Sequence, residues 1–306
     1  MERINVENIR VGPKGFRFKS EYIFEIFNVF LITLFALSCL LPFINVLAIS
    51  FSSAGPASAG RVSLWPIDFT FDAYLYAFSK VRFVMSMWNS VVRVLVGVTI
   101  NMVLIILTAY PLSKPKGVLK GRTIISWFFV TTMLIGGGLI PTYLVVLRTG
   151  LLNTIWSMII PGGVAIFNMV VLLNFFRQIP SEFEESAIID GAGEFTIMLK
   201  IFLPLSMPCL ATLILFSTVG HWNDWFSGSI YLTDINKYPL ATYLRAALTR
   251  PNFDAMNFAD MQRLMSIASR TISSAQIMIG ALPVILVYPF LQRYFVKGLM
   301  LGGLKG

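Results

Sequence analysis

The sequence contains few charged residues and almost none of the side chains that usually bind metal ions. Charged residues make up 13% of its 306 residues, and it has one histidine, His221, and two cysteines, Cys39 and Cys209. Both cysteines lie inside apolar runs and lack the spacing of metal ligands, so we interpret them as small buried hydrophobic residues. These shortages exclude a histidine-rich metal centre and a disulfide framework.

Two nucleotide-binding signatures are also missing. No glycine is followed directly by lysine, so the chain cannot contain the phosphate-binding loop of an ATPase. The pair Gly191 and Gly193 lacks the third glycine and the preceding strand of a dinucleotide site. We therefore expect no catalytic residue and no cofactor in this chain, and we expect any ATP to be hydrolysed by another chain.

Apolar residues, by contrast, are abundant. They make up 56% of the chain, and the mean hydropathy is +0.75. An apolar fraction of roughly one half is already normal for soluble domains, so the surplus indicates lipid as the solvent. The net charge of +9 is compatible with nucleic-acid binding, but the basic residues lie in short clusters between apolar runs. Such clusters are the usual signal of membrane topology, so we expect a bilayer and no nucleic acid.

Six apolar segments are long enough for transmembrane helices, which need ~20 mainly apolar residues. The predicted fold is an all-α, polytopic bundle of six transmembrane helices. It comprises a cytoplasmic N-terminal tail at residues 1–21, the first helix at 22–50 and a core domain at 84–306. The predicted spans are Ile23–Ala48, Ser90–Tyr110, Ile124–Val146, Thr154–Phe176, Ala211–Leu232 and Ser273–Tyr294.

The positive charges predict the orientation of these spans. Short loops rich in lysine and arginine stay in the cytoplasm, and an even number of spans puts both termini on one side. Both basic clusters therefore predict cytoplasmic termini. The clusters are Arg3, Arg10, Lys14, Arg17 and Lys19 before the first span, and Lys114, Lys116, Lys120 and Arg122 between the second and third spans.

The segment 177–204, between the fourth and fifth spans, carries five acidic residues against two basic ones. Ser181 and Glu184 have the spacing of a capping box, which predicts a short helix from Glu182 to about Ile189. Gly191 then ends this helix, because glycine readily adopts the left-handed conformation found after a helix terminus.

A second helix is expected at Ala192–Phe202, leading into the fifth span. The first helix would place Glu182, Glu185 and Ile189 on one face, which could dock on a partner protein. The alternative is an ordinary amphipathic helix packed on lipid headgroups. An anionic leaflet would repel its acidic residues, which favours the docking interpretation.

The same segment resembles a known family motif. The stretch Glu185-Ser186-Ala187, the glycine at 191, and Ile201-x-Leu203-Pro204 after nine further residues match the EAA loop of binding-protein-dependent ABC importer permeases. The one departure is Ser186, where the family usually has alanine. In that family the loop is a coupling helix seated in a cleft of the ATPase subunit. The resemblance assigns this contact to Glu182, Glu185, Ser186, Ala187, Asp190, Gly191, Ala192, Leu203 and Pro204.

The resemblance covers nearly the whole chain and points to the carbohydrate branch, of the maltose-permease second-subunit type with its LplC/YtcP-like relatives. It implies the type I permease fold and import of a sugar, in particular an oligosaccharide, across the bacterial inner membrane. The implied partners are a second permease subunit, two ATPase subunits that bind ATP and Mg, and an extracytoplasmic solute-binding protein. The further matching stretches are 109–114, 137–143, 150–154 and 220–226.

The fifth predicted span contains an unusual group of aromatic and polar residues. Sugars stack on aromatic faces and hydrogen-bond to polar groups, and an ionisable residue at membrane depth faces protein or a water-filled path. We therefore expect that at least one of Trp222, Asn223 and Trp225 lines the transport pathway. The alternative is a structural polar cluster between helices, and the role of Asp224 stays open. The candidate pathway residues are His221, Trp222, Asn223, Asp224 and Trp225.

Two features of the other spans allow more than one interpretation. Arg93 lies within the second span and is expected to extend to the outer membrane interface, with a place along the pathway as the alternative. The glycines at 136–138, followed by Pro141, are expected to loosen the third span. Close packing of helices through small residues explains these glycines equally well.

Two rival classes of membrane protein fit the sequence less well. A secondary transporter would show more charge within the membrane and an inverted repeat. An intramembrane hydrolase could pair His221 with Ser229, but these residues lie about two helical turns apart, which is poor geometry for proton transfer.

Overall fold

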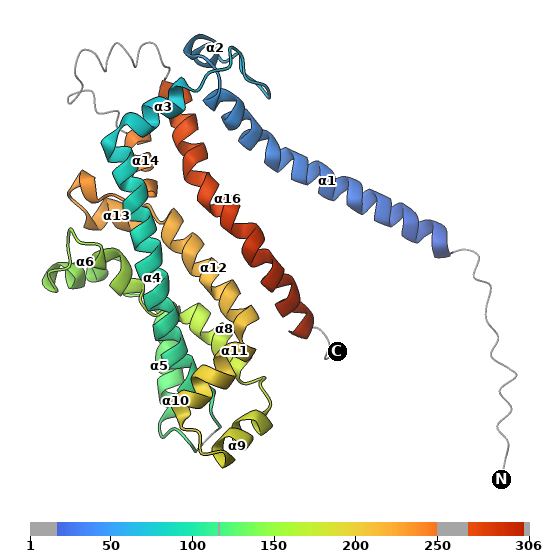
Figure 1. The fold of residues 1–306 in the computed structure, drawn as a ribbon, viewed down its shortest axis with the longest axis vertical. Helices are drawn as coiled ribbons and strands as arrows, with labels where there is room; N and C mark the ends of the chain where they lie inside the picture. The colour runs from blue at the N-terminus through green and yellow to red at the C-terminus, as the bar shows by residue number, and fades with distance from the viewer. Residues whose placement is uncertain (1–16, 116, 250–268, 303–306) are drawn as a thin grey trace, which may run out of the picture.

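The structure is a computed structural model that describes residues 17–115, 117–249 and 269–302 (Figure 1). These residues form helices and no β-strand. Two continuous helices are long and apolar enough to cross a membrane, α1 (Arg17–Ser50) and α4 (Val81–Ser113). They contain the first two predicted spans, and each helix extends several residues beyond the predicted span.

The third and fourth predicted spans are broken helices. Helices α5 (Arg122–Leu134) and α6 (Leu139–Arg148) meet at 113°, and a 45° bend separates α7 (Trp156–Ile159) and η1 (Ile160–Gly162) from α8 (Ile166–Phe176). A Cβ atom added at any of the glycines 136–138 would meet nothing nearer than 4.0 Å, and the 138 position has φ +81°. These glycines therefore permit the bend, and no neighbouring helix of the described residues packs closely against them.

The fifth predicted span, Ala211–Leu232, is wrong at its C-terminal end. Helix α12 (Met207–Asn223) stops nine residues earlier, and the chain turns before α13 (Phe226–Tyr231). A bend of 82° precedes α12, after a segment of three short helical pieces. These pieces are α10 (Glu194–Ile197), the π-helical η2 (Met198–Phe202) and α11 (Leu203–Leu205).

The sixth predicted span lies within α16 (Ser269–Gly302). Within the described residues, two helices qualify as spans, or up to five if each bent pair counts as one, and Arg270–Leu286 is a shorter apolar helix. The count of six spans therefore stays a prediction. The remaining helices are α2 (Ala54–Ser58), α3 (Asp72–Ser79), α9 (Ser181–Ile189), η3 (Ile235–Lys237) and α14 (Leu240–Thr249).

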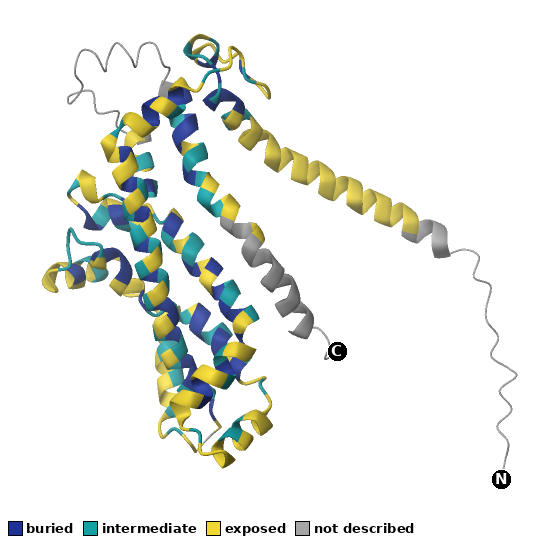
Figure 2. Ribbon diagram, viewed as in Figure 1, coloured by how far each residue is buried: buried dark blue, intermediate teal, exposed yellow. Residues whose placement is uncertain are grey.

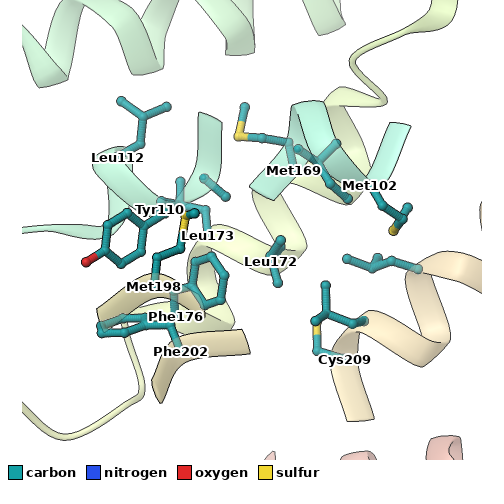
Figure 3. Packing of buried hydrophobic residues seen from close by; sticks show 14 of the residues in the cluster. Met102, Tyr110, Leu112, Met169, Leu172, Leu173, Phe176, Met198, Phe202 and Cys209 are labelled. Atoms are coloured by element: carbon teal, nitrogen blue, oxygen red, sulfur yellow. The ribbon is translucent and has the colours of Figure 1, made fainter. Parts of the chain in front are cut away.

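The elements divide between two ends of an elongated bundle. Helices α2, α3 and α14 lie at one end, and α9 and α10 lie at the other (Figure 1). Between them α4, α8 and α12 pack together around a cluster of buried apolar side chains (Figure 3). Phe176, Met198 and Phe202 extend this cluster to the end that carries α9. The segment 177–204 is therefore packed onto the bundle rather than suspended from it.

Helix α1 is exposed along almost its whole length (Figure 2). Among the residues whose burial is described, its last turns pack inside the chain, where Ala48 and Ile49 contact Ala57 and Val62. Asn45 fixes this junction by donating hydrogen bonds to two backbone carbonyls, one of them Ser63 O at 2.6 Å. An apolar surface of this size needs lipid or another subunit to cover it.

Candidate functional site

Helix α9 begins at Ser181, one residue before the predicted start, and it ends at Ile189 as predicted. The capping box is wrong. Pro180 occupies the N-cap position, where no side chain caps the helix, and Ser181 is the first helical residue. Glu184 instead accepts a hydrogen bond from Lys114 Nζ at 2.6 Å. Because the helix starts one residue earlier than predicted, Ser181 is not at the N-cap position that a capping box requires.

The turn after α9 forms as the glycine predicts. Gly191 has φ +79°, and its N–H donates to Ile188 O at 3.0 Å. The Ala192 N–H donates to Ala187 O at 2.9 Å, which completes the paired-bond pattern of a Schellman motif. Ala187 and Ala192 both pack against the core cluster. A small residue at each position thus lets the turn sit close to the bundle.

The segment after the turn differs from the predicted helix Ala192–Phe202. Gly193 is the N-cap, so the helix starts at Glu194. It passes through π-helical geometry and continues to Leu205, past the predicted end. Leu203 packs against the core cluster, whereas Pro204 is exposed.

The outer face of α9 is both acidic and apolar. Glu182, Glu185 and Ile189 are all exposed, as the helical spacing predicts, and Ile189 is 86% exposed. Ser186 and Asp190 are exposed beside them, and Ser186 Oγ donates to Glu182 O at 2.7 Å. Helix α9 therefore presents an uncovered mixed surface at the end of the bundle (Figure 2).

Lys114, which directly follows α4, holds this segment in place. Its ammonium group lies 2.6 Å from Glu184 Oε1 and 3.0 Å from Glu194 Oε2. The Tyr110 hydroxyl donates to Glu194 Oε2 at 2.7 Å. Burial alone would lower the pKa of Lys114, but the hydrogen bonds with Glu184, Tyr110 and Glu194 outweigh it and raise the pKa above its ordinary value. Lys114 therefore stays charged.

Lys114 was predicted only as part of a basic cluster that sets membrane topology, and its contacts with Glu184 and Glu194 were not predicted. The available signal was the acidic excess of segment 177–204 opposite a lysine at the end of a span. The matching stretch 109–114 includes both Tyr110 and Lys114.

The polar group near the end of α12 is tied to α4. Arg93 is 1% exposed, so the prediction that it extends to the membrane interface is wrong. Its guanidinium forms an ion pair with the Asp224 carboxylate and also donates to Asp224 O at 2.8 Å. The other carboxylate oxygen of Asp224 accepts from the Ser227 N–H at 3.1 Å. Asp224 therefore stabilises the break between α12 and α13.

His221 belongs to a second link between α12 and α4. Its Nε2 lies 2.8 Å from Asn101 Oδ1, and Asn101 Nδ2 donates to Gly162 O at 3.1 Å and to Gly163 O at 2.8 Å. Asn101 thus satisfies carbonyls at the break between η1 and α8. Ser229 Oγ instead donates to Trp225 O at 2.8 Å, so no serine–histidine pair forms.

The candidate pathway residues fall into two groups. His221, Trp222 and Asp224 contact neighbouring elements, and the buried Trp222 donates from Nε1 to Gly280 O at 3.0 Å. Asn223 is exposed, and Trp225 is 41% exposed with the Arg245 guanidinium 5.1 Å from its ring centroid. The structural-cluster interpretation thus fits the first group, and Asn223 and Trp225 are the two most open candidates, classed as exposed.

No group of three or more histidine, cysteine, aspartate or glutamate side chains lies close enough to hold a metal ion in the described ranges. The two cysteines are both free, Cys39 exposed and Cys209 buried.

Comparison with known proteins decides the family. The family model described as the binding-protein-dependent transport system inner membrane component matches residues 15–300. The chain belongs to this family.

Individual relatives agree with this membership. The chain is 38% identical to Protein LplC of Bacillus subtilis (strain 168) over 288 residues, which cover 94% of this chain and 97% of the relative. It is 41% identical over 273 residues to the polygalacturonan/rhamnogalacturonan transport system permease protein YtcP of the same organism, covering 89% and 95%.

A solved structure extends the likeness to three dimensions. One chain of a bacterial ABC transporter involved in the import of the acidic polysaccharide alginate superposes with a TM-score of 0.82. It is 34% identical, and the match covers 90% of this chain and 98% of that one. This protein is therefore a multi-pass inner-membrane permease subunit of an ABC importer. Neither the secondary transporter nor the intramembrane hydrolase receives support.

Proposed function

We propose that this permease subunit imports an oligosaccharide, and that its α9 segment couples transport to a separate ATPase. The observation that carries the coupling role is the exposed acidic and apolar face of α9, formed by Glu182, Glu185 and Ile189 at one end of the bundle. A face of this kind suits a groove on a partner protein, where apolar contacts supply affinity and charges fix the orientation. Ser186, Asp190 and Gly191 complete the exposed edge.

The proposed complex contains four kinds of chain. A second permease subunit covers part of the apolar surface, and two ATPase subunits bind ATP and Mg beneath the coupling segments. A solute-binding protein delivers the sugar from outside. The chain itself holds no cofactor, and both termini lie in the cytoplasm, on the same side as α9.

The relatives favour an anionic substrate. YtcP is named for polygalacturonan and rhamnogalacturonan, and the solved relative imports the acidic polysaccharide alginate. On this chain, Asn223 and Trp225 line the proposed pathway. The exposed Trp225 ring supplies a stacking face for a sugar, and the Arg245 guanidinium beside it supplies positive charge for a uronate carboxylate.

Reconstitution into liposomes tests this function. The chain is assembled with its partner permease and ATPase subunits, and uptake of labelled oligogalacturonate, oligoalginate and maltooligosaccharide is measured with the binding protein present. We expect uptake of an acidic oligosaccharide only when ATP and Mg reach the ATPase side. Equal uptake without the ATPase subunits, or driven by an ion gradient alone, would contradict the proposal. Uptake of the neutral oligosaccharide alone would overturn the substrate class.

A further inference from the structure

The segment 177–204, here called the coupling segment, has two helical arms, α9 before the turn and α10 after it. One buried lysine joins both arms to α4. Glu184 lies on α9, before the turn at Gly191, and Glu194 lies on α10, after it. Lys114 Nζ contacts both carboxylates, at 2.6 and 3.0 Å. A single ammonium group thus bridges the turn and fixes both arms to the end of α4.

The surroundings of Lys114 make this contact strong. Its side chain is 4% exposed, and its ammonium lies 4.3 Å from the centroid of the Tyr110 ring and 5.2 Å from that of Phe202. Water and salt screen a buried ion pair less than a surface pair. Removal of the lysine would leave the half-buried Glu184 without its ammonium partner, whereas Glu194, 59% exposed, would stay in contact with solvent.

The end of α4 is also held by two further cations. The carbonyl of Leu112, in the last turn of α4, accepts hydrogen bonds from Arg122 Nε at 3.0 Å and Arg177 Nη2 at 3.3 Å. Cations at a helix C-terminus are favoured by the helix dipole. The C-terminal end of α4 is therefore bonded to the first residue of α5 and to Arg177, which ends α8 just before α9.

The covalent route from α9 into the membrane is bent. The helical segment Glu194–Leu205 meets α12 at 82°, and it contains the π-helical stretch η2. A displacement along the axis of Glu194–Leu205 is therefore almost perpendicular to the axis of α12. Helix α4 instead runs from Lys114 into the bundle without a break, and it carries Arg93 and Asn101, which bind the backbone at two helix breaks.

We propose that Lys114 is a positioning residue that transmits movement of α9 directly to α4. Movement of the coupling segment then reaches the breaks at Asp224 and Gly162–Gly163 through α4, in parallel with the covalent path to α12. The inference rests on the proposed coupling role of α9. Lys114 connects the coupling segment to α4 from outside the docking face of α9.

The test measures uptake and ATP hydrolysis together in the reconstituted complex. Lys114→Met keeps the length and the apolar contacts of the side chain but removes its charge. We expect the ATPase subunits to co-purify and hydrolyse ATP as in wild type, while uptake per ATP falls about tenfold, within the range of known coupling effects. Lys114→Arg should restore most of the coupling. Lys120→Met, at an exposed lysine of the same loop, is the matched control and should match wild type.

Other outcomes would overturn the inference. Wild-type uptake per ATP in Lys114→Met would do so, as would a loss of assembled complex with the ratio unchanged, since that result shows a structural role alone. If Lys114→Met does not fold, Glu194→Gln replaces it, because Glu194 is 59% exposed and its removal disturbs the core less. Wild-type coupling in Glu194→Gln would then reject the inference. Failure of the proposed function would give a different result, because uptake by the wild-type complex would then not require ATP.

Discussion

Single polar residues on α4 bind the backbone at two helix breaks. Arg93 bonds to Asp224 at the end of α12, and Asn101 bonds to the carbonyls of Gly162 and Gly163 at the end of η1. A backbone group without a partner in the bilayer core costs several kcal/mol, so irregular backbone persists only where protein satisfies it. Arg93 and Asn101 lie eight residues apart on one helix and thus support both breaks from the same side.

Gly97, between these residues, provides a test at this scale. A Cβ atom there would lie 2.6 Å from His221 Nε2, too close for any real contact. Gly97→Ala should therefore displace His221, break its bond to Asn101 and lower the melting temperature of the purified complex. Gly220→Ala is the control, because no atom lies within 4 Å and alanine is favoured in helices by about 1 kcal/mol. Equal melting temperatures for the two variants would count against the close contact.

At the scale of elements, the coupling segment combines a short helix, a left-handed turn and a bent entry into α12. The Schellman turn packs Ala187 and Ala192 against the core cluster, which attaches the C-terminal end of α9 to the bundle. We expect this attachment to be rigid, so that a push on the exposed face of α9 moves the elements to which it is bound.

Substitution of the turn glycine tests that rigidity. Gly191 has φ +79°, where a Cβ atom costs about 1–2 kcal/mol, although space around it is open. Gly191→Ala should raise amide hydrogen exchange at residues 188–192 by about fivefold or more. Gly193→Ala is the matched control, since Gly193 has φ −78° and equally open surroundings. Unchanged exchange in Gly191→Ala would show that the turn does not depend on glycine.

The end of α12 gives a second prediction. Asn223→Ala combined with Trp225→Ala should abolish uptake while leaving assembly intact, because both side chains are exposed. Trp222→Ala should instead reduce the yield of assembled complex, since removal of a buried tryptophan costs about 3–5 kcal/mol. Co-purification and uptake are measured for each variant. Normal transport by the double variant would remove both residues from the pathway.

Local sequence predicted some of these elements and failed at others for one physical reason. The helix at 181–189 and its glycine stop depend on neighbouring residues, and both formed as expected. The capping box failed because the helix starts at Ser181 with Pro180 at the N-cap, and Glu184 instead pairs with Lys114, 70 residues away. The fifth span was drawn too long because hydropathy continues past Asn223, whereas the break depends on Asp224 and on Arg93, 131 residues distant. Contacts between segments far apart in sequence cannot be inferred from local pattern.

At the scale of the whole molecule, the distribution of apolar surface fits a subunit of a larger membrane complex. Helix α1 is exposed along most of its length, and α5 buries no residue within the chain. Composition predicted the membrane and the EAA-like spacing predicted the family, which the family match over residues 15–300 confirms. The orientation and the count of six spans stay predictions.

Glu185 lies exposed on the outer face of α9, the face proposed to dock on a separate ATPase. A substitution at this residue therefore tests the proposed coupling most directly. Glu185→Lys reverses the charge of one residue on the outer face of α9, and no shift in its neighbours' packing is expected because the side chain is exposed. The measurement is uptake per ATP hydrolysed in the reconstituted complex, with Glu185→Asp as the conservative control. We expect this ratio to fall at least about tenfold in Glu185→Lys while ATP hydrolysis continues. A wild-type ratio in that variant would contradict the proposed coupling.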